Sequence, residues 1–233
     1  MTLARRDFLK ATAAVSGGLV IGLHLPGCSK PEQAATGEKK IIETNAWVRI
    51  GTDNSVTLLV DRSEMGQGVF TALPMLLAEE LGVRLERVKV EFAPAGQAYI
   101  NNMIGSQITG GSTSVRDAWT KLRTAGAQAR RMLVTAAAQQ WRIPISGIRV
   151  QNGVIQSPRG KKLTFGQVAE AASKLPVPKD VKLKSPGNFS VIGKPVKRLD
   201  TPGKVDGSTQ YGVDVRLPGM LYAAIALPPS AAR

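Results

Sequence analysis

Twice along the chain, a β-strand pattern leads through a glycine-rich turn into a helix pattern. Residues 56–60 alternate as a strand does, and Gly66-Gln67-Gly68 separates them from helix-forming residues at 69–81. Residues 88–92 alternate again, and a glycine- and amide-rich loop then leads to a long amphipathic stretch over 110–141. Because strands and helices alternate, we predict an α+β fold: a two-layer sandwich of a mixed sheet and helices, rather than a helical bundle or a β-barrel.

Two hairpins extend this pattern. Residues 47–50 and 56–60 are rich in β-branched side chains, and the turn residues Thr52-Asp53-Asn54 lie between them. Residues 148–150 and 154–156 flank Asn152-Gly153, a strong signal for a two-residue hairpin turn. We therefore expect two antiparallel strand pairs in addition to the strand at 88–92.

Two local signals concern helix ends. Thr164 and Gln167 have the spacing of a capping box, which predicts a short helix that runs through Lys174. Pro74 lies inside the helix pattern at 69–81 and has no backbone N–H to donate. That helix is expected either to begin a turn late or to kink at the proline.

The first 28 residues have the layout of an export signal. Arg5-Arg6 precedes Phe8-Leu9-Lys10, and residues 11–25 form a weakly apolar stretch that is too short and glycine-rich to span a bilayer. This string resembles the twin-arginine signal, which exports proteins already folded, so we predict a periplasmic location. The alternative is an ordinary secretory signal that contains two arginines.

Cys28 closes this leader in a sequence similar to a lipobox, Leu25-Pro26-Gly27-Cys28. Lipidation of Cys28 would tether the protein to the membrane, whereas cleavage further on would remove the cysteine, and both interpretations are open. The 233 residues contain no second cysteine, which excludes disulfides and Cys-ligated zinc or iron–sulfur clusters within the chain. His24 is the only histidine and lies in the leader.

The chain is strongly basic. Its formal net charge is +14, and residues 1–28 contribute +2 of this, so +12 belongs to the remainder. Such a balance favours anionic partners: phosphate-bearing cofactors, an acidic subunit or lipid headgroups. Nucleic acid is not expected, because the chain is exported and has no basic module interleaved with aromatic residues.

Composition changes along the chain suggest its organisation. Residues 29–45 are polar and predict a tether, and ordered structure is expected from Ala46 to the end of a domain at 46–175. Residues 176–190 are basic and rich in proline, as a linker is. A new module with room for two or three strands then occupies 191–233.

The two glycine-rich turns share one physical property. Each enters the N-terminus of a helix, where free backbone N–H groups and the helix dipole favour an anion. The first turn contains Gly66, Gln67 and Gly68, and the second contains Gly110, Gly111, Ser112, Thr113 and Ser114, followed by the charge of Arg116. A purely structural interpretation makes Ser112 or Thr113 an N-cap. In the functional interpretation both turns converge on one anionic ligand.

The same residues carry a family resemblance. The string Glu64-Met65-Gly66-Gln67-Gly68, followed by the string from Thr109 to Trp119, resembles the molybdopterin-binding large subunit of the xanthine dehydrogenase and aldehyde oxidase family. The nearest subgroup is the beta-subunit type of isoquinoline 1-oxidoreductase. Residues 175–184 and 192–202 also match, and 204–223 look like the start of the family's α/β hammerhead domain.

This resemblance implies a molybdenum hydroxylase, whose pterin-bound metal inserts a water-derived oxygen at an activated C–H bond of an aldehyde or an N-heterocycle. By the same resemblance, Gly66, Gln67 and Gly68 would contact the pterin near the metal. Residues 110–114 would hold the phosphate or cytosine dinucleotide part of the cofactor. The implied partners are a small iron–sulfur subunit, which carries all the clusters, and a cytochrome c as electron acceptor. Trp119, Leu122 and Met132 are expected to be ordinary packing residues.

The chain also departs from the family. The family's general base is a glutamate near the end of a much longer subunit; Glu64 is not that residue, so we assign no catalytic or metal-ligating residue here. Residues 226–233 leave the family pattern inside an expected strand. The prediction is therefore an N-terminal part of the enzyme that is not catalytic alone. The alternatives are an exported module that binds a cofactor or a partner, and a lipoprotein tethered through Cys28.

Overall fold

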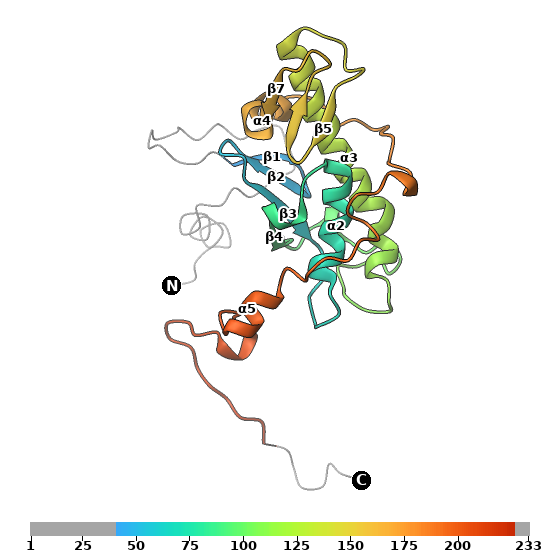
Figure 1. Cartoon of the computed structure of the whole chain (residues 1–233). Helices are drawn as coiled ribbons and strands as arrows, with labels where there is room; N and C mark the ends of the chain where they lie inside the picture. The colour runs from blue at the N-terminus through green and yellow to red at the C-terminus, as the bar shows by residue number, and fades with distance from the viewer. Residues whose placement is uncertain (1–40, 227–233) are drawn as a thin grey trace, which may run out of the picture. The chain divides into compact units, whose positions relative to one another are not determined.

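The computed structural model describes residues 41–226 (Figure 1). For the strand residues 41–45 it describes the backbone alone. Arg5, Arg6 and Cys28 lie outside the described residues, so the export signal and the lipobox stay predictions. Within residues 41–226 no helix is both long and apolar enough to cross a membrane.

A four-stranded mixed sheet organises the domain. Its order is β1 (Ile41–Asn45), β2 (Val48–Gly51), β3 (Val56–Val60) and β4 (Val88–Phe92). The first two pairs are antiparallel and β3 pairs with β4 in parallel, which confirms the predicted hairpin and the strand at 88–92. The tether prediction was wrong over Ile41–Asn45: these residues pair with β2, whose outer edge otherwise leaves backbone groups without partners.

Two helices follow the parallel strands. Helix α2 (Val69–Leu81) joins β3 to β4, and α3 (Ser114–Trp141) follows the loop after β4. Helix α2 begins at Val69 and runs past Pro74, so the late start is excluded. The two helices pack closely where Gly126 faces the Leu77 carbonyl, since a Cβ added at Gly126 would lie 2.6 Å from that oxygen.

A second, antiparallel sheet contains β5 (Arg149–Gln151), β6 (Val154–Gln156) and β7 (Lys162–Thr164), and helix α4 (Phe165–Ser173) follows. The turn at Asn152-Gly153 has φ angles of 52° and 78°, as the predicted hairpin requires. At the start of α4, the Gln167 side chain accepts the Thr164 N–H at 2.8 Å, as the capping box predicts.

The core joins both sheets to the helices. Fully buried side chains come from β2, β3, α2, α3, β6 and α4, and they include Ile50, Leu58, Leu77, Leu133, Ile155 and Phe165. Burial of such side chains stabilises the fold by about 1.5–3 kcal/mol each. The α+β fold with a mixed sheet is thus confirmed. Leu122 and Met132 are buried as expected, whereas Trp119 is partly exposed and packs edge-on against Phe189.

The C-terminal part differs from the sequence prediction. Residues 191–226 contain no strand; they form α5 (Thr201–Asp206) and a short 3-10 turn, η4 (Gly212–Asp214). Val213 and Leu221 are 79% and 92% exposed, so they bury little of their surface against the described chain. A strand needs a neighbour to pair its backbone groups. Without one here, the predicted hammerhead strands do not form.

Candidate functional site

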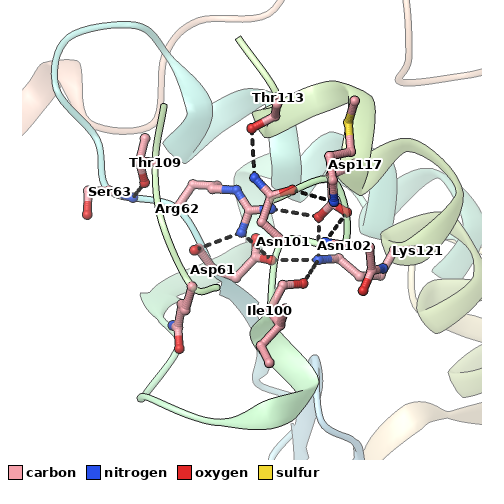
Figure 2. Close-up of polar contacts among 12 residues, drawn as sticks. Asp61, Arg62, Ser63, Ile100, Asn101, Asn102, Thr109, Thr113, Asp117 and Lys121 are labelled. Carbon is pink, nitrogen blue, oxygen red and sulfur yellow. Dashed lines mark hydrogen bonds and ion pairs between the residues drawn. The ribbon is translucent and has the colours of Figure 1, made fainter. Parts of the chain in front are cut away.

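The two glycine-rich turns lie at the same edge of the sheet. Because β3 and β4 are parallel, the segments that leave their carboxyl ends emerge together. The Ser63 N–H, just before the first turn, donates to the Thr109 hydroxyl, just before the second, at 2.8 Å (Figure 2). This contact joins the two segments that carry the glycine-rich turns.

Next to this junction, a cluster of buried ion pairs links the end of β3 to helix α3. Arg62, at 1% exposure, contacts Asp117 of α3 at 2.6 Å and Asp61 at 2.6 Å (Figure 2). Lys121 contacts the same two carboxylates at 2.6 and 2.8 Å. Burial raises the pKa of Asp117, but the Lys121 ammonium, the Asn102 N–H and the Arg62 guanidinium together lower it below its ordinary value. The Asp117 carboxylate is therefore held charged, and it ties α3 to the end of β3.

The second turn combines a left-handed backbone with an open helix start. Gly111 and Ser112 have φ angles of 60° and 53°. Thr113 occupies the N-cap position, but its hydroxyl donates back to the Gly110 carbonyl at 2.7 Å and accepts from the Asn101 amide at 2.7 Å. The Thr113 side chain makes no capping hydrogen bond with the first amides of α3, so Thr113 does not play the role that the structural interpretation gave it. These amides are available to an anion.

The amides of the first turn are not free for a ligand, because they already donate to the Glu64 carboxylate. The Glu64 carboxylate accepts from the N–H groups of Gly66, Gly68 and Phe70 at 2.8–2.9 Å. Burial raises the pKa of Glu64, and these three hydrogen bonds more than offset it, so the pKa is lowered. The expectation of free amides at this helix start was wrong, since a nearby acidic side chain satisfies them. The Gln67 side chain is also engaged within the turn, where its amide donates to the Ser63 carbonyl at 2.9 Å.

The glycines of both turns border open space. A Cβ added at Gly66, Gly68 or Gly110 would meet no atom within 4 Å, and one at Gly111 would meet only the Thr113 methyl at 3.7 Å. Packing inside the chain therefore does not require these glycines, and a ligand has room to approach the backbone closely. The second turn fits an anionic group of a cofactor. The first turn leaves room for a ligand, and Glu64 already holds its backbone in one conformation.

Arg198 reaches the first turn from far along the chain. Its guanidinium donates to the Gly66 carbonyl at 2.9 Å and contacts Glu64 at 3.1 Å and Asp200 at 2.7 Å. Asp200 also pairs with Lys204. Sequence analysis did not single out Arg198, Asp200 or Lys204 as site residues, although Arg198 lies in the segment 192–202 that carried part of the resemblance. Within residues 41–226, no three His, Cys, Asp or Glu side chains form a metal-ligand cluster.

Comparison with known proteins identifies the family. The model of the molybdopterin cofactor-binding domain matches residues 4–216. The chain belongs to this family. It is 32% identical to the beta subunit of isoquinoline 1-oxidoreductase from Brevundimonas diminuta, over 98% of this chain and 34% of the relative. It is 28% identical to a nicotinate dehydrogenase subunit of Pseudomonas putida, over 97% of this chain and 18% of the relative. The predicted resemblance is confirmed.

A third relative is the membrane-bound aldehyde dehydrogenase (pyrroloquinoline-quinone) of Gluconacetobacter polyoxogenes, 28% identical over 98% of this chain and 30% of the relative. The chain thus spans about a third or less of the length of these relatives. Among solved structures, quinoline 2-oxidoreductase from Pseudomonas putida 86 aligns with a TM-score of 0.40 at 20% identity, over 55% of this chain and 16% of that one. CO dehydrogenase from Oligotropha carboxidovorans aligns with a TM-score of 0.39 at 21% identity, over 53% and 15%.

Proposed function

We propose that this chain is the cofactor-holding N-terminal part of an exported molybdenum hydroxylase that oxidises aldehydes or N-heterocycles. One observation carries the proposal: two glycine-rich turns that border open space are joined through Ser63 and Thr109 at one edge of the sheet. The family match and the names of the relatives support the reaction class.

The two turns take different parts of the cofactor in this proposal. Residues 110–114 hold its phosphate, in the cytosine dinucleotide form, because the α3 amides are uncapped and Ser112 and Ser114 add hydroxyls. Arg116, exposed in the first turn of α3, adds positive charge. Gly66, Gln67 and Gly68 face the pterin, because the Gly66 and Gly68 amides already donate to Glu64 and are not free for a second anion. When bound, the cofactor supplies the oxidation chemistry, and the chain positions it.

Partners and location complete the proposal. Cys28 is the single cysteine of the chain, so the chain cannot ligate an iron–sulfur cluster; a small iron–sulfur subunit accepts the electrons and passes them to a cytochrome c. The chain is then not catalytic alone. The arginine pair at Arg5-Arg6 supports folded export to the periplasm, and Cys28 supports a lipid tether.

A matched pair of substitutions at Gly111 tests the cofactor site. Asparagine and aspartate have the same shape and both tolerate the left-handed backbone found there, so they differ only in charge. The chain is produced in a host that makes molybdopterin, and molybdenum and pterin per chain are measured. We expect Gly111→Asn to retain most of the cofactor and Gly111→Asp to lose at least about 90% of it, since one repelled charge costs about tenfold or more in affinity. Equal retention by the two variants would contradict the proposal.

A further inference from the structure

The segment from Lys184 to Asp200 lies along helix α2 instead of crossing to a separate module. Its first half meets the last turn of α2, where Glu79 and Glu80 are both 0% exposed. Its second half meets the first turn of α2, where the Leu199 N–H donates to the Thr71 hydroxyl at 3.0 Å. The predicted linker at 176–190 is therefore partly bound to the domain, and the bound segment runs antiparallel to α2.

Two buried carboxylates anchor the first half. Glu79 accepts the N–H groups of Ser190, Val191 and Ile192 at 2.6–3.1 Å and pairs with the Lys184 ammonium at 2.7 Å. Glu80 accepts the Lys184 N–H at 3.0 Å and two bonds from the Arg123 guanidinium at 2.8 and 3.0 Å. Since a buried carboxylate with these donors has a strongly favoured position, the anchor is rigid.

Near the end of the second half of this segment, Arg198 contacts the first glycine-rich turn. Its Nη2 donates to the carboxylates of Glu64 and Asp200, and its Nη1 donates to the Gly66 carbonyl. Asp200 repels the Glu64 charge, so removal of Arg198 would leave the two carboxylates opposed. Glu64 is the residue that holds the amides of Gly66, Gly68 and Phe70 in place. The turn is thus in contact with a side chain 132 positions away.

We propose that residues Lys184–Asp200 form a clasp that fixes the first glycine-rich turn in its cofactor-ready shape, with Arg198 as the positioning residue. The link to the cofactor rests on the proposed function; the clasp itself does not.

Amide hydrogen exchange followed by NMR on the full chain without cofactor tests the clasp. In Arg198→Ala we expect the amides of Gly66, Gly68 and Phe70 to exchange about tenfold faster, the loss that corresponds to one charged hydrogen bond. Arg198→Lys restores a single contact and gives an intermediate rate. Arg216→Ala, an arginine whose contacts lie within the C-terminal segment, leaves the turn amides unchanged.

The midpoint of thermal unfolding separates positioning from general loosening. Arg198 is 38% exposed at its side chain, so Arg198→Ala is expected to unfold within a few degrees of the unmodified chain. Turn amides that exchange at the unmodified rate, or that speed up equally with all of α2, would overturn the clasp. Molybdenum content distinguishes the two proposals: a chain whose turn is loosened by Arg198→Ala but which never binds molybdenum refutes the proposed function and leaves the clasp standing.

Discussion

Replacement of Glu79 by glutamine replaces one oxygen of a fully buried carboxylate with the NH₂ of an amide. In the structure, Oε2 accepts three backbone N–H groups, from Ser190, Val191 and Ile192, while Oε1 accepts from the Lys184 ammonium. In either orientation, the glutamine NH₂ therefore points at donors. The change removes the charge that pairs with the Lys184 ammonium, and the NH₂ group faces either that ammonium or the three backbone amides.

The expected loss in the free energy of unfolding is about 3–5 kcal/mol, the usual cost of removing one partner of a buried ion pair. The pKa supports this magnitude. Burial raises the pKa of Glu79, but Lys184 and the three amides lower it from 4.5 to about 2. A depression of this size corresponds to roughly 3 kcal/mol of stability at neutral pH.

Urea denaturation of Glu79→Gln at pH 7 measures this loss, with Glu170→Gln as control. Glu170 is exposed and lies 3.7 Å from Lys174, so its substitution is expected to cost no more than about 0.5 kcal/mol. A loss below about 1 kcal/mol for Glu79→Gln would refute the view that this carboxylate anchors the segment.

The unmodified chain and Glu79→Gln also give a test by pH, in which the direction of the change in stability is defined. The folded-state pKa of Glu79 lies below the unfolded value, so the unfolded chain binds more protons between the two. The stabilisation is therefore complete above about pH 5 and is lost as the pH falls from 4.5 toward 2. The difference in unfolding free energy between the unmodified chain and Glu79→Gln should narrow over that range. A difference that stays constant down to about pH 3 would contradict the assignment.

Two further substitutions probe the frame of the site. Gly126→Ala places a methyl group 2.6 Å from a carbonyl oxygen of α2, and should lower the urea-unfolding free energy by about 1–3 kcal/mol; a neutral effect would show that the two helices separate easily. Asp117→Asn leaves the buried Arg62 without full charge compensation, so we expect the unfolding free energy to fall by about 3 kcal/mol in the same assay. An unchanged urea midpoint would show that the ion cluster does not stabilise the fold.

Local signals predicted most of the regular structure. The Asn152-Gly153 turn, the capping-box pair Thr164 and Gln167, and the alternation at 88–92 each depend on near neighbours in the chain. Strand β1 was missed because its pairing depends on the free edge of β2. The strands expected after residue 191 did not form for the corresponding reason: nothing in the described chain pairs with them.

The site was predicted in part. The positions of both glycine-rich turns followed from sequence, and the structure brings their flanks together. The role of Glu64 was not foreseen, although its spacing from Gly66 and Gly68 would have indicated an acidic side chain that reaches a helix start. Arg123 is a charged residue of an amphipathic helix, yet it is buried against Glu80. Residues so far apart in sequence become partners only through the tertiary fold.

The central claim is that both turns contact one cofactor, and glycine-selective ¹⁵N NMR tests it directly. The amide resonances of Gly66, Gly68, Gly110 and Gly111 are compared between chain purified with cofactor and chain without it. All four should shift, while Gly160, which lies in the turn between β6 and β7, should not. Shifts confined to one turn, or found in neither, would contradict the claim.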